Sequence, residues 1–171
     1  MNFQLRPFSI EDIDSLVKFA NNYNIAKNLT DAFPRPYSVE DGEAFIEMAT
    51  QNYPRNIFAI EINGEASGAV GVHQQKDIYR KNLELGYWLA EPYWGKGIMT
   101  KAIVQMTDYA FKNFEVNRIY ARPFGYNLAS QRVLEKAGFV LEAKLEKTFF
   151  KNGELVDELI YAVRRNTWNH F

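Results

Sequence analysis

The sequence predicts an α+β protein with a mixed, mostly antiparallel central sheet flanked by helices. Asn63-Gly64 and Asn152-Gly153 each separate two strand-like segments, and such dipeptides are strong local signals for hairpins and antiparallel pairing. Between these hairpins, residues 83–122 form a strand–helix–strand unit, which favours one parallel pair. No Pro/Gly/Ser-rich linker or internal repeat divides residues 1–171, so we expect a single domain over this length.

The expected order of elements is β-α-α-β-β-β-α-β-α-β-β. Ser9 or Asp12 is a suitable cap for the first helix, and Ser38 with Asp41 forms a weak capping box for the second. Residues 28–37 are expected to be a loop, because their two prolines disfavour regular structure. The predicted strands are residues 3–8, 57–62, 66–72, 83–89, 118–122, 139–150 and 155–163, and the last two helices follow Gly97 and Asn127.

Composition excludes several classes of function. A formal net charge of −1 and a pI of about 6.2 give no global field for nucleic acid or an anionic membrane. The absence of cysteine excludes disulfides and a thiolate nucleophile. His73 and His170 lack metal-ligand spacing, and no apolar run approaches the ~20 residues of a membrane span. We therefore expect a cytoplasmic protein without a metal. The sequence leaves both a monomer and a homodimer open.

A glycine turn between a strand and a helix is the most informative local motif. Gly95-Lys96-Gly97 follows the apolar strand and opens a long amphipathic helix, whose first-turn N–H groups lack intrahelical acceptors. Glycines let an anion approach this backbone closely. The turn lacks the Ser or Thr of a phosphate-binding Walker loop, and Thr100 replaces the third glycine of a dinucleotide fingerprint. A turn without any ligand remains the alternative.

Two segments resemble the GNAT superfamily of acyl-CoA-dependent N-acetyltransferases. Residues 84–100 resemble its pyrophosphate-binding segment, Gln/Arg-x-x-Gly-x-Gly/Ala, with Trp94, Gly97 and Met99 at the motif positions and an extra Gly95. Residues 117–139 resemble the strand and helix that follow in the family. The early stretch FPRPYSVEDGEAFI is similar to the ribosomal-protein N-acetyltransferase (RimJ/RimL-like) branch. The resemblance spans nearly all of the chain.

This resemblance implies an enzyme that transfers acetyl from acetyl-CoA to a primary amine by direct attack in a ternary complex. The implied acceptor is a protein N-terminal α-amine or a small amine. A non-catalytic acyl-CoA-binding or sensing module remains open. The residues that the resemblance assigns to the cofactor are Trp88, Leu89, Trp94, Gly95, Lys96, Gly97, Ile98, Met99, Thr100, Asn127 and Ser130.

The expected chemistry needs a base, because an ammonium with a pKa near ~10 must first lose a proton. Glu84 is the leading candidate, as a carboxylate inside an apolar strand, and Gly86 on the same face leaves room for a substrate. The alternative for Glu84 is an ion-paired or surface carboxylate. Tyr126 is a weaker acid or base candidate, and the resemblance places Ser130 near the leaving sulfur.

Other candidates have structural alternatives of similar weight. Asn127 is a natural N-cap, which would commit its side chain to its own helix. His73 ends a strand, where a structural or solvated role is favoured over catalysis. In the family, the proline loop borders the acceptor groove, so its side chains are candidate acceptor contacts, although packing on the core is an equal alternative. These loop residues are Asp31, Phe33, Arg35 and Tyr37.

Overall fold

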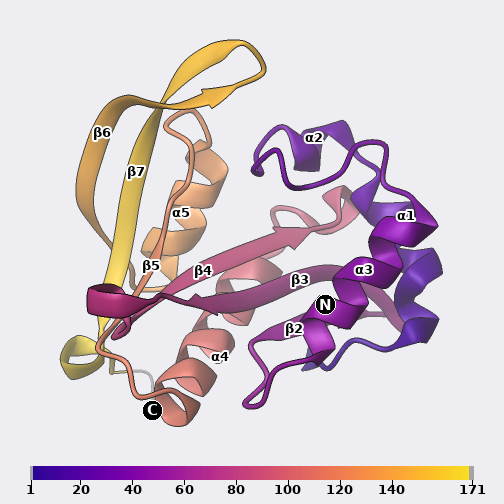
Figure 1. The fold of residues 1–171 in the computed structure, drawn as a ribbon, viewed down its shortest axis with the longest axis horizontal. Coiled ribbons are helices and arrows are strands. Elements are labelled where there is room, and N and C mark those ends of the chain that lie inside the picture. The colour runs from indigo at the N-terminus through magenta and orange to yellow at the C-terminus, as the bar shows by residue number, and fades with distance from the viewer. Residues whose placement is uncertain (1, 170–171) are drawn as a thin grey trace. The chain divides into compact units, whose positions relative to one another are not determined.

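The structure, a computed structural model, describes residues 2–169, so His170 lies outside the described residues. Within this range the chain forms a seven-stranded sheet with the order β1-β2-β3-β4-β5-β7-β6 (Figure 1). β4 and β5 pair in parallel, whereas the pairs β1–β2, β2–β3, β5–β7 and β6–β7 are antiparallel. The strands are β1 (Gln4–Arg6), β2 (Ile57–Ile62), β3 (Glu65–Gln74), β4 (Asn82–Leu89), β5 (Arg118–Ala121), β6 (Val140–Lys151) and β7 (Glu154–Arg164).

The observed elements confirm the predicted class and order. The helices are α1 (Ile13–Ala20), α2 (Tyr23–Ala26), α3 (Val39–Thr50), α4 (Ile98–Asn113) and α5 (Leu128–Lys136). The one-turn helix α2 and four 3-10 turns, including η1 (Ile10–Asp12) and η3 (Glu91–Tyr93), were not predicted. Such short elements carry too little periodicity to be recognised.

Local signals of a few residues explain where elements begin and turn. Ser38 caps α3 by accepting the Asp41 N–H at 3.2 Å, and the Asp41 carboxylate accepts the Ser38 N–H at 2.8 Å. Asn63 and Gly64 adopt φ values of 53° and 83°, which a two-residue hairpin of the primed type requires. Asn152 and Gly153 repeat these values. The capping box and both hairpins therefore match the prediction.

The chain divides into two compact units, each of which has its own core. The first comprises Met1–Gly71 and Tyr87–Ala102, and the second comprises Val72–Gly86 and Ile103–Phe171. β3, β4 and α4 run through both units. The single domain over residues 1–171 stays a prediction.

The core of the first unit lies between two helices and the first strands. Figure 1 shows α1 beside α3, and both contribute buried side chains to one apolar cluster with β2, β3 and the end of β4. The fully buried members include Leu16, Ala59 and Ala66. The spacing of Ile13, Leu16, Val17 and Ala20 on α1 explains why that helix buries one face.

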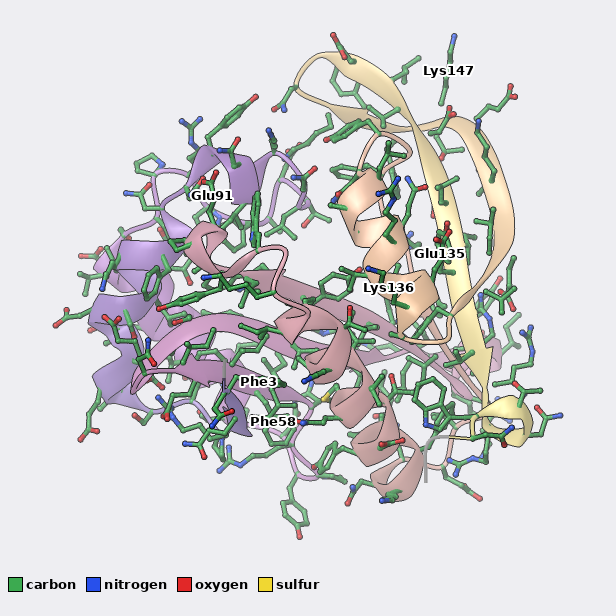
Figure 2. The ribbon with its side chains drawn as sticks, turned by 180° about the vertical axis from the view of Figure 1, so that it is seen from behind. Phe3, Phe58, Glu91, Glu135, Lys136 and Lys147 are labelled. Carbon is green, nitrogen blue, oxygen red and sulfur yellow. The ribbon has the colours of Figure 1, made fainter. Side chains whose placement is uncertain are left out.

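The second unit packs α4 and α5 against β5 and β7. Its buried side chains include Ile103, Met106 and Ile119, and Figure 1 shows α5 beside the long β6–β7 hairpin. The Tyr161 hydroxyl on β7 donates to Glu135 on α5 at 3.0 Å, and Glu135 is labelled in Figure 2. This packing holds the N-terminus of α5 at a defined place in the unit.

Arg165 satisfies the C-terminal end of α4. Its guanidinium donates to the carbonyls of Phe111, Phe114 and Val116 at 2.6, 2.8 and 2.8 Å. The Phe111 carbonyl belongs to the last turn of α4, whose carbonyls lack intrahelical donors, whereas Phe114 and Val116 follow the helix; a cation there also complements the helix dipole. Among residues 2–169, the structure contains no helix that is long and apolar enough to cross a membrane.

Candidate active site

The glycine turn before α4 has the backbone geometry of an anion site. Gly95 and Gly97 both adopt φ of 73°, a conformation that side chains with a Cβ rarely adopt, and a Cβ at either position would meet open space. The Lys101 N–H donates to the Gly97 carbonyl at 3.3 Å as α4 begins. Helix geometry therefore leaves the N–H groups from Gly97 to Thr100 without intrahelical acceptors. The first turn of α4 also carries no acidic residue, so an anion meets no repulsion there.

The side chains of the turn are committed to the turn itself. The Trp94 indole Nε1 donates to the Leu89 carbonyl at 2.7 Å. The Lys96 ammonium donates to the Pro92 carbonyl at 2.8 Å and lies 5.4 Å from the centroid of the Tyr93 ring. Glu91, labelled in Figure 2, accepts from Asn22 at 2.7 Å and ties the preceding 3-10 turn to the start of α2. The main chain is therefore the part of this turn that is available to an anion.

β3 and β4 approach each other closely just before this turn. A Cβ on Gly68 would lie 2.5 Å from the Trp88 carbonyl oxygen, so only glycine fits there. The Ala90 N–H donates to the Ser67 carbonyl at 2.7 Å. Trp88 and Leu89 are buried, and the Trp88 ring lies 6.1 Å from that of Phe33. The predicted cofactor contacts of these two residues can therefore come only from their backbone.

The four residues of the proline loop that were predicted to contact the acceptor differ in their burial. Tyr37 is buried in the core with 4% exposure, and burial followed by the charge of Asp41 raises its pKa to about 12. Phe33 is partly buried and packs against Tyr37 at a ring distance of 5.5 Å. Both aromatic side chains therefore pack on the core, which is the alternative to an acceptor contact. Asp31 and Arg35 are exposed, and Arg35 lies 4.7 Å from the Tyr23 ring.

Glu84 lies in a polar cluster rather than in an isolated apolar pocket. Its carboxylate accepts from Arg122 Nε at 2.9 Å, from Arg122 Nη2 at 3.2 Å and from the Tyr120 hydroxyl at 3.4 Å. The ion-paired alternative for Glu84 is thus the observed arrangement, and 27% of its side chain remains accessible. The His73 imidazole Nε2 lies 3.7 Å from the place of a Cβ on Gly86, so His73 borders the room that Gly86 provides.

The pKa of His73 is lowered. Desolvation of the ring lowers it, and attraction to the Glu84 carboxylate opposes that change. The lowered pKa favours the neutral form of the His73 imidazole. His73 lies on β3, and Glu84 lies on the neighbouring strand β4.

The N-terminus of α5 carries the remaining candidates. Asn127 caps the helix, because its side-chain oxygen accepts the Ser130 N–H at 3.1 Å. Its amide NH₂ is then the group that can donate to a ligand. Ser130 is half-buried in the first turn, and Tyr126 is 49% exposed with its ring 5.5 Å from that of Phe124. The roles predicted for these residues stay predictions.

Three members of the Glu84 cluster, Tyr120, Arg122 and Glu158, were not predicted from the sequence. Glu158 is a buried carboxylate in the apolar strand β7, so the criterion that selected Glu84 also applied to it. Arg122 follows Arg118 and Tyr120 at alternating positions, which indicates a shared face but names no partner.

The fold and the glycine turn define the class of protein as an acetyl-CoA-dependent acetyltransferase, and comparison with known proteins agrees. Residues 2–140 match the model of the acetyltransferase (GNAT) domain, so the chain belongs to the GNAT acetyltransferase family.

Named relatives acetylate different acceptors. The chain is 33% identical over 106 residues to the putative ribosomal N-acetyltransferase YdaF of Bacillus subtilis, a match that covers 62% of this chain and 57% of YdaF. It is 28% identical to spermidine N(1)-acetyltransferase of Escherichia coli strain K12, over 88% of this chain and 80% of that protein. The YdaF match supports the RimJ/RimL-like branch that the sequence suggested.

A solved structure extends the comparison to the cofactor. The microcin C7 self-immunity acetyltransferase MccE, in complex with acetyl-CoA and AMP, superposes with a TM-score of 0.81 and 26% identity. The match covers 95% of this chain and 92% of that one. MccE binds acetyl-CoA in that structure, and in this chain the first-turn N–H groups of α4 are the groups that suit a pyrophosphate.

Proposed function

We propose that this chain acetylates a primary amine, with a protein N-terminal α-amine as the first acceptor class. The glycine turn that opens α4 carries the proposal, because two positive φ values and first-turn N–H groups without intrahelical acceptors suit the close approach of a pyrophosphate. The match to YdaF supports a protein N-terminus. The match to spermidine N(1)-acetyltransferase over 88% of this chain supports a polyamine as the second candidate.

The proposed reaction is a direct attack without an acyl-enzyme, since the chain has no cysteine to carry the acetyl group. The amine nitrogen first forms a C–N bond with the thioester carbonyl carbon, which gives a tetrahedral oxyanion, and the C–S bond breaks when that intermediate collapses. The Glu84 carboxylate takes the proton from the amine, and the Ser130 hydroxyl donates a hydrogen bond to the departing thiolate of coenzyme A. The Leu89 N–H stabilises the oxyanion that forms in between. The cytoplasmic location also stays a prediction.

A binding measurement combined with a turnover assay tests this function. Acetyl-CoA at 100 times its dissociation constant should stabilise the chain by about 2.7 kcal/mol, which raises Tm by roughly 5–10 °C. Release of free thiol should then depend on an added amine, and peptide N-termini and spermidine are compared as acceptors. A flat melting curve would exclude the cofactor site. Stabilisation without thiol release from either acceptor class would instead identify a binding module.

Gly97→Ala tests the turn itself, with Gly153→Ala as its matched control. Both glycines have positive φ, and an added methyl would have no neighbour within 4 Å at either position, so both substitutions add similar backbone strain. Only the methyl at position 97 would obstruct the proposed pyrophosphate site. We expect Gly97→Ala to raise the KM for acetyl-CoA about tenfold and Gly153→Ala to leave it unchanged. Equal effects of the two variants would remove the turn from the cofactor site.

A further inference from the structure

Arg122 links two glutamates from different strands. Its Nε and Nη2 atoms donate to Glu84 on β4 at 2.9 and 3.2 Å, and its Nη1 lies 3.5 Å from Oε1 of Glu158 on β7. The other oxygen of Glu158 accepts from the Thr148 hydroxyl at 3.1 Å. One edge of the planar guanidinium therefore faces Glu84, and its remaining nitrogen faces Glu158.

The two glutamates differ in accessibility. Glu158 is buried, with 10% of its side chain exposed, whereas 27% of the Glu84 side chain is accessible. A buried carboxylate is costly without a cation or hydrogen-bond donors, so Glu158 and Thr148 anchor the far side of Arg122. The two-bond edge of the guanidinium is directed at the accessible carboxylate. Around Arg6, by contrast, two hydrogen bonds of the guanidinium go to the buried Asp12.

We propose that Arg122 is a positioning residue that holds the Glu84 carboxylate in the orientation needed to take the proton from the acceptor amine. The proposal rests on the proposed function, in which Glu84 is the base. Glu158 fixes Arg122, and Arg122 fixes Glu84. The other polar groups that face Glu84 are Tyr120 on β5 and His73 on β3. Arg122 itself does not contact the reacting atoms.

Two substitutions separate the charge of Arg122 from its geometry. Arg122→Gln removes both, so kcat should fall by about 10–100-fold, because Glu84 loses the contacts that orient its carboxylate. Arg122→Lys keeps the charge without the planar two-bond edge. Its kcat should therefore also stay reduced. The KM for acetyl-CoA should be unchanged in both variants.

Arg118→Gln is the matched control. Arg118 lies on β5, four residues before Arg122 and on the same face by alternation, and donates to Glu142 at 2.6 and 3.0 Å. Removing it deletes an equivalent arginine–glutamate pair that does not include Glu84. We expect the kcat of the wild type, whereas a loss equal to that of Arg122→Gln would overturn the positioning role.

Glu158→Gln tests the anchor and keeps the proposal testable should the Arg122 variants not fold. It leaves Arg122 in place but weakens its attachment, so kcat should fall by about 3–10-fold. If the wild type turns over, an unaltered kcat in Arg122→Gln or in Glu158→Gln would overturn the positioning role alone. Acetyl-CoA binding without any wild-type turnover would instead overturn the proposed function, and the positioning role with it.

Discussion

Two arginines in this chain each pair with two carboxylates. The two clusters differ in whether the buried or the accessible carboxylate accepts two hydrogen bonds from the arginine. Arg6 pairs with Asp12 and Glu61, and Arg122 pairs with Glu84 and Glu158. In the first cluster the buried carboxylate has the better contacts. Asp12 is 4% exposed and accepts two bonds from Arg6, at 2.7 and 2.8 Å, and a third from the Ser9 N–H at 2.9 Å.

The pKa of Asp12 reflects these contacts. Desolvation alone would raise the pKa of Asp12, but the hydrogen bonds from Arg6 and the Ser9 N–H outweigh it, and the pKa is lowered. Asp12 thereby closes the capping box of the 3-10 turn η1 and ties it to β1. In the second cluster the two-bond contact goes to the accessible Glu84. This difference supports the proposal that the first cluster stabilises the fold and the second orients a carboxylate for a ligand.

Glu84→Gln should have the largest effect. If Glu84 is the base, turnover falls by about 10²–10⁴-fold, because the neutral amide takes no proton, while stabilisation by acetyl-CoA is retained. The measurement is amine-dependent thiol release together with the acetyl-CoA melting shift. Glu61→Gln, which changes the more accessible carboxylate of the first cluster, serves as the control and should keep wild-type turnover. Unchanged turnover in Glu84→Gln would remove it as the base.

Asp12→Asn should show the opposite pattern. It removes a buried carboxylate from its pair with the partly exposed Arg6, so we expect a loss of about 3 kcal/mol in unfolding free energy and a fall in Tm of roughly 6–12 °C. Glu84→Gln, at a partly exposed pair, should cost less than about 1 kcal/mol. Urea unfolding of both variants gives the two values. Similar losses in the two variants would contradict the division between a stabilising and an orienting cluster.

The parts of the fold and site that follow from the sequence are those encoded within a few residues. Gly95 and Gly97 have positive φ, and the capping box at Ser38 forms, because each depends on the preferences of adjacent residues. Alternation along β4 similarly indicates that Glu84 does not share the face of Leu83 and Leu85, which are both buried.

The partners of Glu84 could not be predicted in the same way. Arg122 directly follows β5 and Glu158 lies on β7, and these strands are neighbours in the sheet although β6 comes between them in sequence. Alternation assigns a face to a side chain but does not say which strand lies next to it. Tyr37 shows the same limit, because an aromatic in a proline loop gives no sign of whether it points to solvent or into a core, and it is buried.

The acid sensitivity of folding should trace to the first cluster. The pKa of Asp12 is lowered in the folded chain from its ordinary value of 3.8. Its contribution to stability is therefore fully present above that value and is lost as pH falls through the lower folded value. The urea midpoint measured from pH 6 downward should decline less steeply in Asp12→Asn than in the wild type. Parallel declines would show that other carboxylates cause the acid sensitivity.

Tyr120→Phe should have the smallest effect on turnover. The Tyr120 hydroxyl lies 3.4 Å from Glu84 Oε2, a long contact beside the 2.9 Å bond from Arg122 Nε to Glu84 Oε1. Losing a long, weak hydrogen bond to the carboxylate, worth about 0.5 kcal/mol, changes kcat by no more than about threefold, because Arg122 still orients the carboxylate. The assay is thiol release under saturating acetyl-CoA and acceptor. A fall of about a hundredfold would place the hydroxyl on the path of the proton, so that the second cluster would be an acid–base group of several members rather than one carboxylate held by one arginine.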